Sequence, residues 1–239
     1  MAGAAQHLID PAEPRDDMAH GFANPLDFFN YLSPSAWVNG VIEQVSGVDI
    51  FGYATDTLTG EWDALYKFGD ALDSLAQFLQ QAGIDVQAGI NRLDSNWDGN
   101  AADAAVTYFT SLAAATSRQQ LALHHAAEGY RDAARGAWQL SNQLGNVLQA
   151  VTDKAILIGV SAAIGTVTAE TGVGAVVGYG VAGWQTIELL NLINRASMII
   201  NTAGTVIMAA FGGGMAVAGQ GGDLSAVPLP AAPYAPPGA

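Results

Sequence analysis

Residues 93–105 of this chain read Leu-Asp-Ser-Asn-Trp-Asp-Gly-Asn-Ala-Ala-Asp-Ala-Ala. This stretch places a turn, Trp97-Asp98-Gly99, between two long segments in which apolar residues recur at helical spacing. Gly99 suits the turn because glycine adopts a positive φ without strain. Asp98 or Asn100 suits the start of the second helix, because a short polar side chain can accept hydrogen bonds from the first free backbone amides. The stretch therefore predicts a helix end, a tight turn and a helix start in succession.

Both segments beside the turn carry small or apolar residues at seven-residue spacing. Before the turn the two registers are Leu65, Leu72, Leu79, Val86, Leu93 and Phe68, Leu75, Ala82, Gly89. After the turn they are Ala105, Leu112, Gln119, Ala126, Ala133, Leu140, Val147 and Phe109, Thr116, Leu123, Tyr130, Ala137, Leu144, Val151. Because an isolated helix cannot bury such a stripe, we predict an antiparallel helical hairpin over residues 61–151. The seam between its helices is predicted at Leu65, Leu72, Leu79, Val86, Phe109, Leu112, Leu123 and Tyr130.

The composition favours a helical protein without a nucleic-acid partner. Half of the 239 residues are apolar but only 8% are aromatic, and alanine and glycine are plentiful, which suits close helix packing. Twenty-two acidic residues against eight lysines and arginines give a net charge of −14, which opposes binding to nucleic acids and anionic lipids. The absence of cysteine excludes disulfides and thiolate metal sites.

The chain divides into four predicted regions. Residues 1–24 are charged, lack the apolar core of a secretory signal and are predicted to be flexible. Residues 25–154 are predicted to form a helical cap followed by the hairpin. Residues 155–219 form an apolar helical region rich in glycine and alanine, and residues 220–239 form a proline-rich tail predicted to be disordered.

The cap is predicted from helix-start and helix-end signals before the hairpin. Ser33 and Pro34 begin one of its helices, and Gly47 ends that helix. Aromatic residues are too dense here for a solvated linker; they are Phe28, Phe29, Tyr31, Trp37 and Phe51. We expect these side chains to pack as core against the hairpin, with a partner-docking patch as the alternative.

The apolar region allows two interpretations. Residues 196–222 carry no charge over 27 residues, a length that can span a bilayer. Asn201 and the three glycines of residues 212–214 interrupt this run. We therefore favour a soluble helical region that packs on the end of the second hairpin helix, around Leu140, Leu144, Leu148 and Val151. A membrane-inserting segment is the alternative.

No part of the sequence forms a strong catalytic or metal-binding pattern. His124, His125 and Glu128 lie within one helical turn, but the two histidines are adjacent and no third ligand is placed beside them. The glycines of residues 172–183 lack the Gly-Lys-Ser/Thr of a phosphate-binding loop. No nucleophile is paired with a base. We therefore expect no enzymatic activity, no cofactor and no bound metal.

The turn and its flanking helices resemble the WXG family of helical hairpins, which bacteria export through type VII secretion. The resemblance rests on Trp97-x-Gly99 between two heptad-patterned helices, followed by Asn-Ala-Ala-Asp-Ala-Ala at residues 100–105, and it covers about residues 61–150. The preceding cap and the following apolar region are similar to those of the longer, toxin-associated actinobacterial members.

The family's second export element, Tyr-x-x-x-Asp/Glu after the second helix, is missing from this chain. Tyr130 is followed four residues later by Ala134. The spacing match of Tyr66 with Asp70 lies before the turn. The resemblance therefore implies that a partner supplies this signal.

The resemblance implies a non-enzymatic type VII secretion substrate, an export module without a toxin domain, that acts through helical protein contacts. Its implied partners are another WXG-like hairpin or a second copy of the chain, and the secretion ATPase. Its implied destination is secreted or cell-surface, without a cleavable signal peptide. Trp97 then either plugs the end of the hairpin or presents a surface to another protein. The alternative function is a membrane-inserting effector or anchor that uses residues 155–219.

Overall fold

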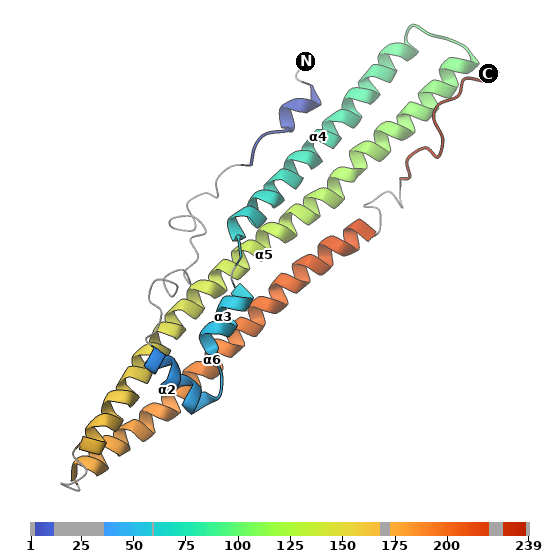
Figure 1. The fold of residues 1–239 in the computed structure, drawn as a ribbon. Helices are drawn as coiled ribbons and strands as arrows, with labels where there is room; N and C mark the ends of the chain where they lie inside the picture. The colour runs from blue at the N-terminus through green and yellow to red at the C-terminus, as the bar shows by residue number, and fades with distance from the viewer. Residues whose placement is uncertain (1–2, 12–35, 59, 168–172, 220–226, 238–239) are drawn as a thin grey trace. The chain divides into compact units, whose positions relative to one another are not determined.

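The computed structural model describes residues 3–11, 36–58, 60–167, 173–219 and 227–237. Its helices are η1 (Ala4–His7), α2 (Ala36–Ser46), α3 (Ile50–Leu58), α4 (Trp62–Asp94), α5 (Asn100–Val167) and α6 (Val173–Gly219), as Figure 1 shows. These described ranges contain no strand, which confirms the all-α class and the C-terminal apolar helix. The predictions for Ser33, Pro34 and the aromatic residues at 28, 29 and 31 lie outside the described residues, as do residues 12–24 and 220–226.

The chain forms two compact units. The first unit comprises Met1–Gly21, Asp63–Ala134 and Ala209–Ala239, and the second comprises Phe22–Trp62 and Arg135–Met208. This division differs from the predicted boundary at residue 154, because α5 continues through that position without a break. The four predicted regions reflect changes in composition along the sequence, whereas the two units are defined by which residues pack together.

Helix α5 begins at Asn100 as predicted but ends at Val167, well beyond the predicted end at residue 151. The extension is stabilised by burial, since Val151, Ala155 and Ile158 continue the three-to-four-residue spacing of the buried face. Gly159 lowers helix propensity, but a Cβ atom at this residue would lie 2.7 Å from the Trp37 ring. The glycine thus allows α2 to approach α5 closely within the second unit.

In the first unit, the smallest residues of α4 make its closest contacts with α5. Gly69, Ala76, Gly83 and Ile90 are buried at seven-residue spacing. A Cβ atom added to Gly69 would lie 2.8 Å from the Ala127 carbonyl oxygen, and one added to Gly83 would lie 2.6 Å from the Ala113 carbonyl oxygen and would also meet Ser117. The two backbones therefore approach closely at these two glycines.

The observed contact line differs from the predicted seam. Each predicted seam residue is only partly buried: Leu65, Leu72, Leu79, Val86, Phe109, Leu112, Leu123 and Tyr130. In the second predicted register, Phe68 is 49% and Leu75 is 37% exposed. The distance between packed helices depends on the side chains at the contact, and glycine permits the shortest distance. The contact therefore centres on the glycine line, and the large side chains flank it.

The second unit buries large side chains from four helices. Its buried apolar residues include Val38, Ile42, Ile50, Ala54, Leu58, Leu144, Leu148, Val151, Ile158, Leu189, Ile193, Ile200 and Ala203. The Tyr53 hydroxyl on α3 donates a hydrogen bond to the Asn201 side-chain oxygen on α6 at 2.8 Å. The predicted overhang of the second hairpin helix is therefore covered around Leu144, Leu148 and Val151, while Leu140 is partly buried.

Candidate functional site

The turn between α4 and α5 has the backbone conformation that its glycine was predicted to supply. Gly99 has a φ of 105°, a region that residues with a side chain rarely adopt. A Cβ atom at this position would meet nothing within 4 Å. The requirement for glycine is therefore conformational, and the space around the turn remains open.

The helix caps at the turn differ from the prediction. Among the described residues, the Asp98 carboxylate and the Asn100 amide have no hydrogen-bond partner. The Gly99 carbonyl oxygen accepts hydrogen bonds from the amides of Ala102 and Asp103, at 2.8 and 3.1 Å. The bond from Asp103 is the first regular hydrogen bond of α5, and the bond from Ala102 satisfies one of the amides that the helix leaves free.

Two residues that the sequence analysis passed over close the end of α4. The Ser95 hydroxyl and the Asn96 side-chain amide both donate to the Arg92 carbonyl oxygen, at 2.8 and 2.9 Å. These bonds satisfy an acceptor that the helix itself leaves free. A serine and an asparagine directly after a helical pattern are the signal that identifies such a cap.

The tip of the turn is exposed. Residues 91–100 are all exposed, and Trp97 keeps 36% of its surface accessible. Leu93 beside it is 42% exposed. Of the two roles considered for Trp97, its exposure favours the presented surface over a plug at the end of the hairpin. Trp97 and Leu93 together place two large apolar side chains beside Asp98.

Of the two histidines considered as metal ligands, His124 makes a polar contact between α4 and α5, whereas His125 contacts a residue of its own helix. His124 Nδ1 lies 2.6 Å from a carboxylate oxygen of Asp73, and Arg131 donates to Asp70 at 3.1 Å. His125 lies 3.8 Å from Glu128. Within the described ranges, no group of three His, Cys, Asp or Glu residues is arranged to hold a metal ion. The Asp73–His124 and Asp70–Arg131 contacts join the two helices.

One face of α4 is an incompletely covered apolar stripe. We call it the α4 stripe and define it by Leu65, Phe68, Leu72, Leu75, Leu79 and Val86. These residues are spaced by three, four or seven positions, so they lie on one side of the helix. All six keep part of their surface accessible, and Phe68 makes an edge-to-face contact with Tyr130 at a centroid distance of 5.0 Å. The stripe has the residue types of a helix interface, and Phe68 and Leu75 are its exposed members.

Helix α6 also exposes large apolar side chains in the second unit. Trp184 is 67% exposed, and Ile187, Met198 and Met208 are exposed as well. Among the described residues, one helical stretch, Ala182–Gly213, has the length and composition to cross a membrane, and 22% of its most apolar window is buried. Only the length and composition of this stretch indicate that it could cross a membrane.

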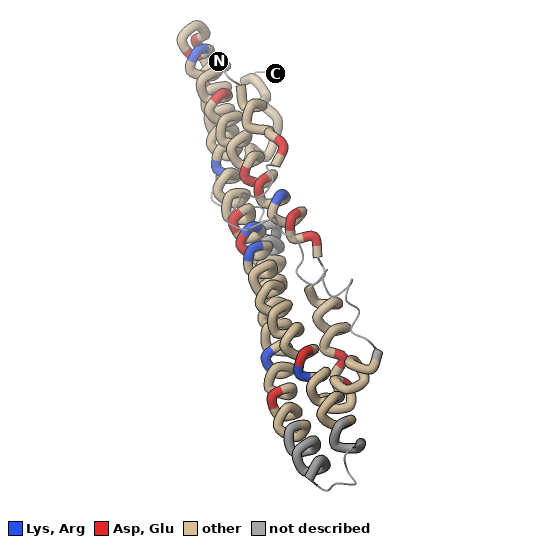
Figure 2. Tube along the Cα trace, turned by 90° about the vertical axis from the view of Figure 1, so that its left-hand side faces the viewer, with Lys and Arg blue, Asp and Glu red and all other residues tan. Residues whose placement is uncertain are grey.

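An ion pair joins α5 to α6 beside these apolar residues. Lys154 donates to the Glu188 carboxylate and, at 2.8 Å, to the Gln185 side-chain oxygen. The hydrogen bond from Lys154, together with the lysine charge, lowers the pKa of Glu188 below its ordinary value of 4.5. Figure 2 shows lysines and arginines as isolated positions, without a continuous basic stripe along the described residues.

Comparison of the chain with protein-family models, with curated proteins and with solved structures finds no match.

Proposed function

We propose that residues 61–151 contain a WXG-type antiparallel hairpin and that the protein is a type VII secretion substrate that acts through helical protein contacts rather than catalysis. Three observations support the proposal: the positive φ of Gly99 in the turn, the exposure of Trp97 at its tip, and the contacts that pair Gly69 with Ala127 and Gly83 with Ala113. Residues 155–219 then accompany the hairpin as an apolar helical region.

The incompletely covered α4 stripe is the observation that carries the proposal. Phe68 and Leu75 are the large stripe residues with the most accessible surface. A stable interface removes on the order of 800 Å² from each partner, and burial contributes about 25 cal/mol per Å² before entropy is subtracted. A second helical hairpin presents the complementary apolar stripe. The proposed occupant is therefore another WXG-like hairpin protein or a second copy of this chain.

The turn is the proposed recognition element for export. In this proposal the secretion ATPase binds the tip formed by Trp97, Asp98, Gly99 and Asn100, and the partner hairpin supplies the missing Tyr-x-x-x-Asp/Glu signal. Asp70, which belongs to the one spacing match, is bonded to Arg131 and is therefore engaged within the unit. The destination is the cell surface or the medium, reached without a cleavable signal peptide.

A charge substitution on the stripe tests the proposal. Leu75→Glu places a carboxylate on the exposed stripe, and Ala88→Glu places the same group on the opposite, exposed face of α4. We expect Leu75→Glu to abolish association, measured by light scattering for the chain alone and for the chain co-expressed with a WXG-like hairpin protein, and to reduce export into the medium. Ala88→Glu should preserve both. Unchanged association and export in folded Leu75→Glu protein would contradict the proposal.

The exposed apolar face of α6 favours a second candidate function, a membrane effector or anchor. The four exposed side chains named above lie in a stretch of which little is buried. If this face binds lipid, the protein should float with zwitterionic vesicles, and the pair of changes Trp184→Glu and Ile187→Glu should keep it at the bottom of the gradient. Ala88→Glu, at an exposed position of α4 outside this stretch, is the control. Wild-type protein that stays at the bottom at neutral and acidic pH would exclude this function.

A further inference from the structure

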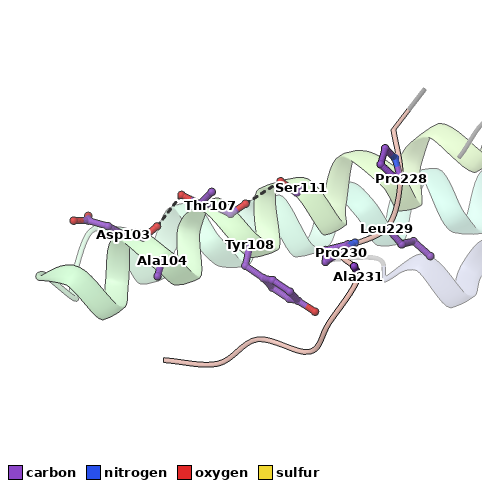
Figure 3. Close-up of a pocket in the computed structure, with 9 residues that line it drawn as sticks. All are labelled: Asp103, Ala104, Thr107, Tyr108, Ser111, Pro228, Leu229, Pro230 and Ala231. Atoms are coloured by element: carbon purple, nitrogen blue, oxygen red, sulfur yellow. Dashed lines mark hydrogen bonds between the residues drawn. The ribbon is translucent and has the colours of Figure 1, made fainter. Parts of the chain in front are cut away.

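The C-terminal segment of the chain lies against α5 in the first unit. Residues 227–237 read Val-Pro-Leu-Pro-Ala-Ala-Pro-Tyr-Ala-Pro-Pro, with five prolines and no charge. The segment has neither helix nor strand. Figure 3 shows Pro228, Leu229, Pro230 and Ala231 beside the first turns of α5. The sequence predicts a disordered tail here, yet this part of the tail has a defined contact.

Tyr234 anchors the segment. Its ring centroid lies 5.7 Å from that of Tyr108 and 5.8 Å from that of Phe109, and both ring pairs are tilted. Its hydroxyl donates a hydrogen bond to the Ala101 carbonyl oxygen at 2.9 Å. The side chain thus combines ring contact with one directed hydrogen bond, a combination that gives tyrosine its value at interfaces. Because Tyr108 and Phe109 also contact each other edge-to-face at 5.1 Å, the anchor packs on a pre-formed aromatic pair.

A groove of about 800 Å³ lies between α5 and residues 228–231 of the tail, which form one of its walls. Its walls are Asp103, Ala104, Thr107, Tyr108 and Ser111 of α5 and residues 228–231 of the tail, and Figure 3 shows the Tyr108 ring directed toward the tail. The Thr107 and Ser111 hydroxyls donate to carbonyl oxygens of their own helix, at 2.9 and 3.0 Å. Since these hydroxyl protons are already used, the groove presents mainly carbon surface to the prolines.

We propose that this face of α5 is a binding site for a proline-rich segment that bears a tyrosine, and that residues 227–237 occupy it as an intramolecular strap. Proline suits the site because its restricted φ lowers the entropy lost on binding, and aromatic-lined grooves are the usual receptors for such segments. The strap covers Tyr108 and Phe109, and its release exposes them.

A competition experiment on the full-length chain tests the strap. The probe is a fluorescently labelled synthetic peptide of residues 227–237, and the receptors are the wild-type protein and its Tyr234→Ala variant. In the wild type the strap competes at an effective concentration that reaches the millimolar range for short linkers, so we expect about tenfold weaker peptide binding than in the variant, measured by fluorescence anisotropy. Helix content by circular dichroism should be unchanged, because residue 234 lies outside the helices.

Two further variants of the protein locate the peptide-binding site on α5. Adding Tyr108→Ala to the Tyr234→Ala variant should abolish saturable peptide binding, whereas adding Leu121→Ala, an exposed position of α5 outside the groove, should preserve it. A peptide with alanine in place of Tyr234 should not bind, and one with phenylalanine should bind several-fold more weakly than the parent peptide. Equal peptide affinity for wild type and Tyr234→Ala, or no saturable binding to folded Tyr234→Ala protein, would overturn the proposal.

Discussion

The two units of the chain hold their helices together by different means. In the first unit, α4 approaches α5 through Gly69 and Gly83, and the large side chains beside this line stay partly exposed. In the second unit, Leu144, Leu148 and Leu189 are at most 1% exposed and fill the space between helices. Because burial of apolar area is the main source of stability, the second unit carries its stability in its own core. The first unit keeps more of its large apolar side chains on the surface, as Phe68 and Leu75 show.

The largest expected effect contrasts one leucine from each unit. Leu148→Ala removes a fully buried side chain from the second unit and should cost about 3 kcal/mol of unfolding free energy. Leu75→Ala removes a side chain of which 37% is exposed and should cost less than about 1 kcal/mol. Urea unfolding followed by circular dichroism measures both. Equal losses would remove the distinction between the two units.

A second pair of substitutions tests the glycine contact of the first unit. Alanine favours a helix by about 1 kcal/mol over glycine, so Gly89→Ala, with open space around it, should raise stability by up to that amount. Gly83→Ala should instead lower stability by about 1–3 kcal/mol, because its Cβ atom would lie against the Ala113 carbonyl oxygen and Ser117. Thermal unfolding distinguishes the signs. Stabilisation by both substitutions would mean that the helices do not meet at Gly83.

Buried polar atoms without a hydrogen-bond partner occur in the described residues of both units, at Gln119 in the first unit and at Asn39 and Trp62 in the second. In the described structure the Gln119 side-chain nitrogen of the first unit is buried without a hydrogen-bond partner, whereas Ser141 in the second unit donates to the Ala137 carbonyl oxygen at 2.9 Å. Gln119→Leu should therefore raise the unfolding free energy by about 1 kcal/mol, since an unpaired buried polar group is costly. Ser141→Ala should lower it by up to about 1 kcal/mol. Denaturant midpoints measure both changes, and destabilisation by Gln119→Leu would show that this amide has a partner in solution.

The smallest expected effect is the pH dependence of the Lys154–Glu188 pair in the second unit. The folded pKa of Glu188 is lowered, so the pair stabilises the protein above the ordinary value of 4.5 and loses this contribution as the pH falls through the folded value. The melting temperature of the wild type should exceed that of Glu188→Gln at pH 7, and the difference should shrink below pH 4.5. Because the pair is partly exposed, the difference should be small and should decrease in high salt. A difference that persists at pH 3 would assign the effect to packing.

The features predicted from the sequence are those that depend on a few neighbouring residues. The turn at Trp97-Asp98-Gly99, the start of α5 at Asn100 and the positive φ of Gly99 follow from backbone preferences and hydrogen-bond needs within one helical turn. Heptad spacing likewise predicts helices and an apolar face, because it depends only on the helical repeat.

Tertiary packing decided which face of each helix meets its neighbour. The contact forms at Gly69 and Gly83 rather than at the leucines beside them, because glycine lets the two backbones approach closely. The sequence of α4 alone does not predict this, since the contact also depends on which residues of α5 lie opposite. The continuation of α5 to Val167 depends on side chains that α2 and α6 bring to it within the second unit. The contact of Tyr234 with Tyr108 joins residues more than a hundred positions apart, and no local pattern encodes it. Such contacts are set by the packing of complementary surfaces after the helices have formed, because local preferences fix a helix but leave its neighbours undetermined.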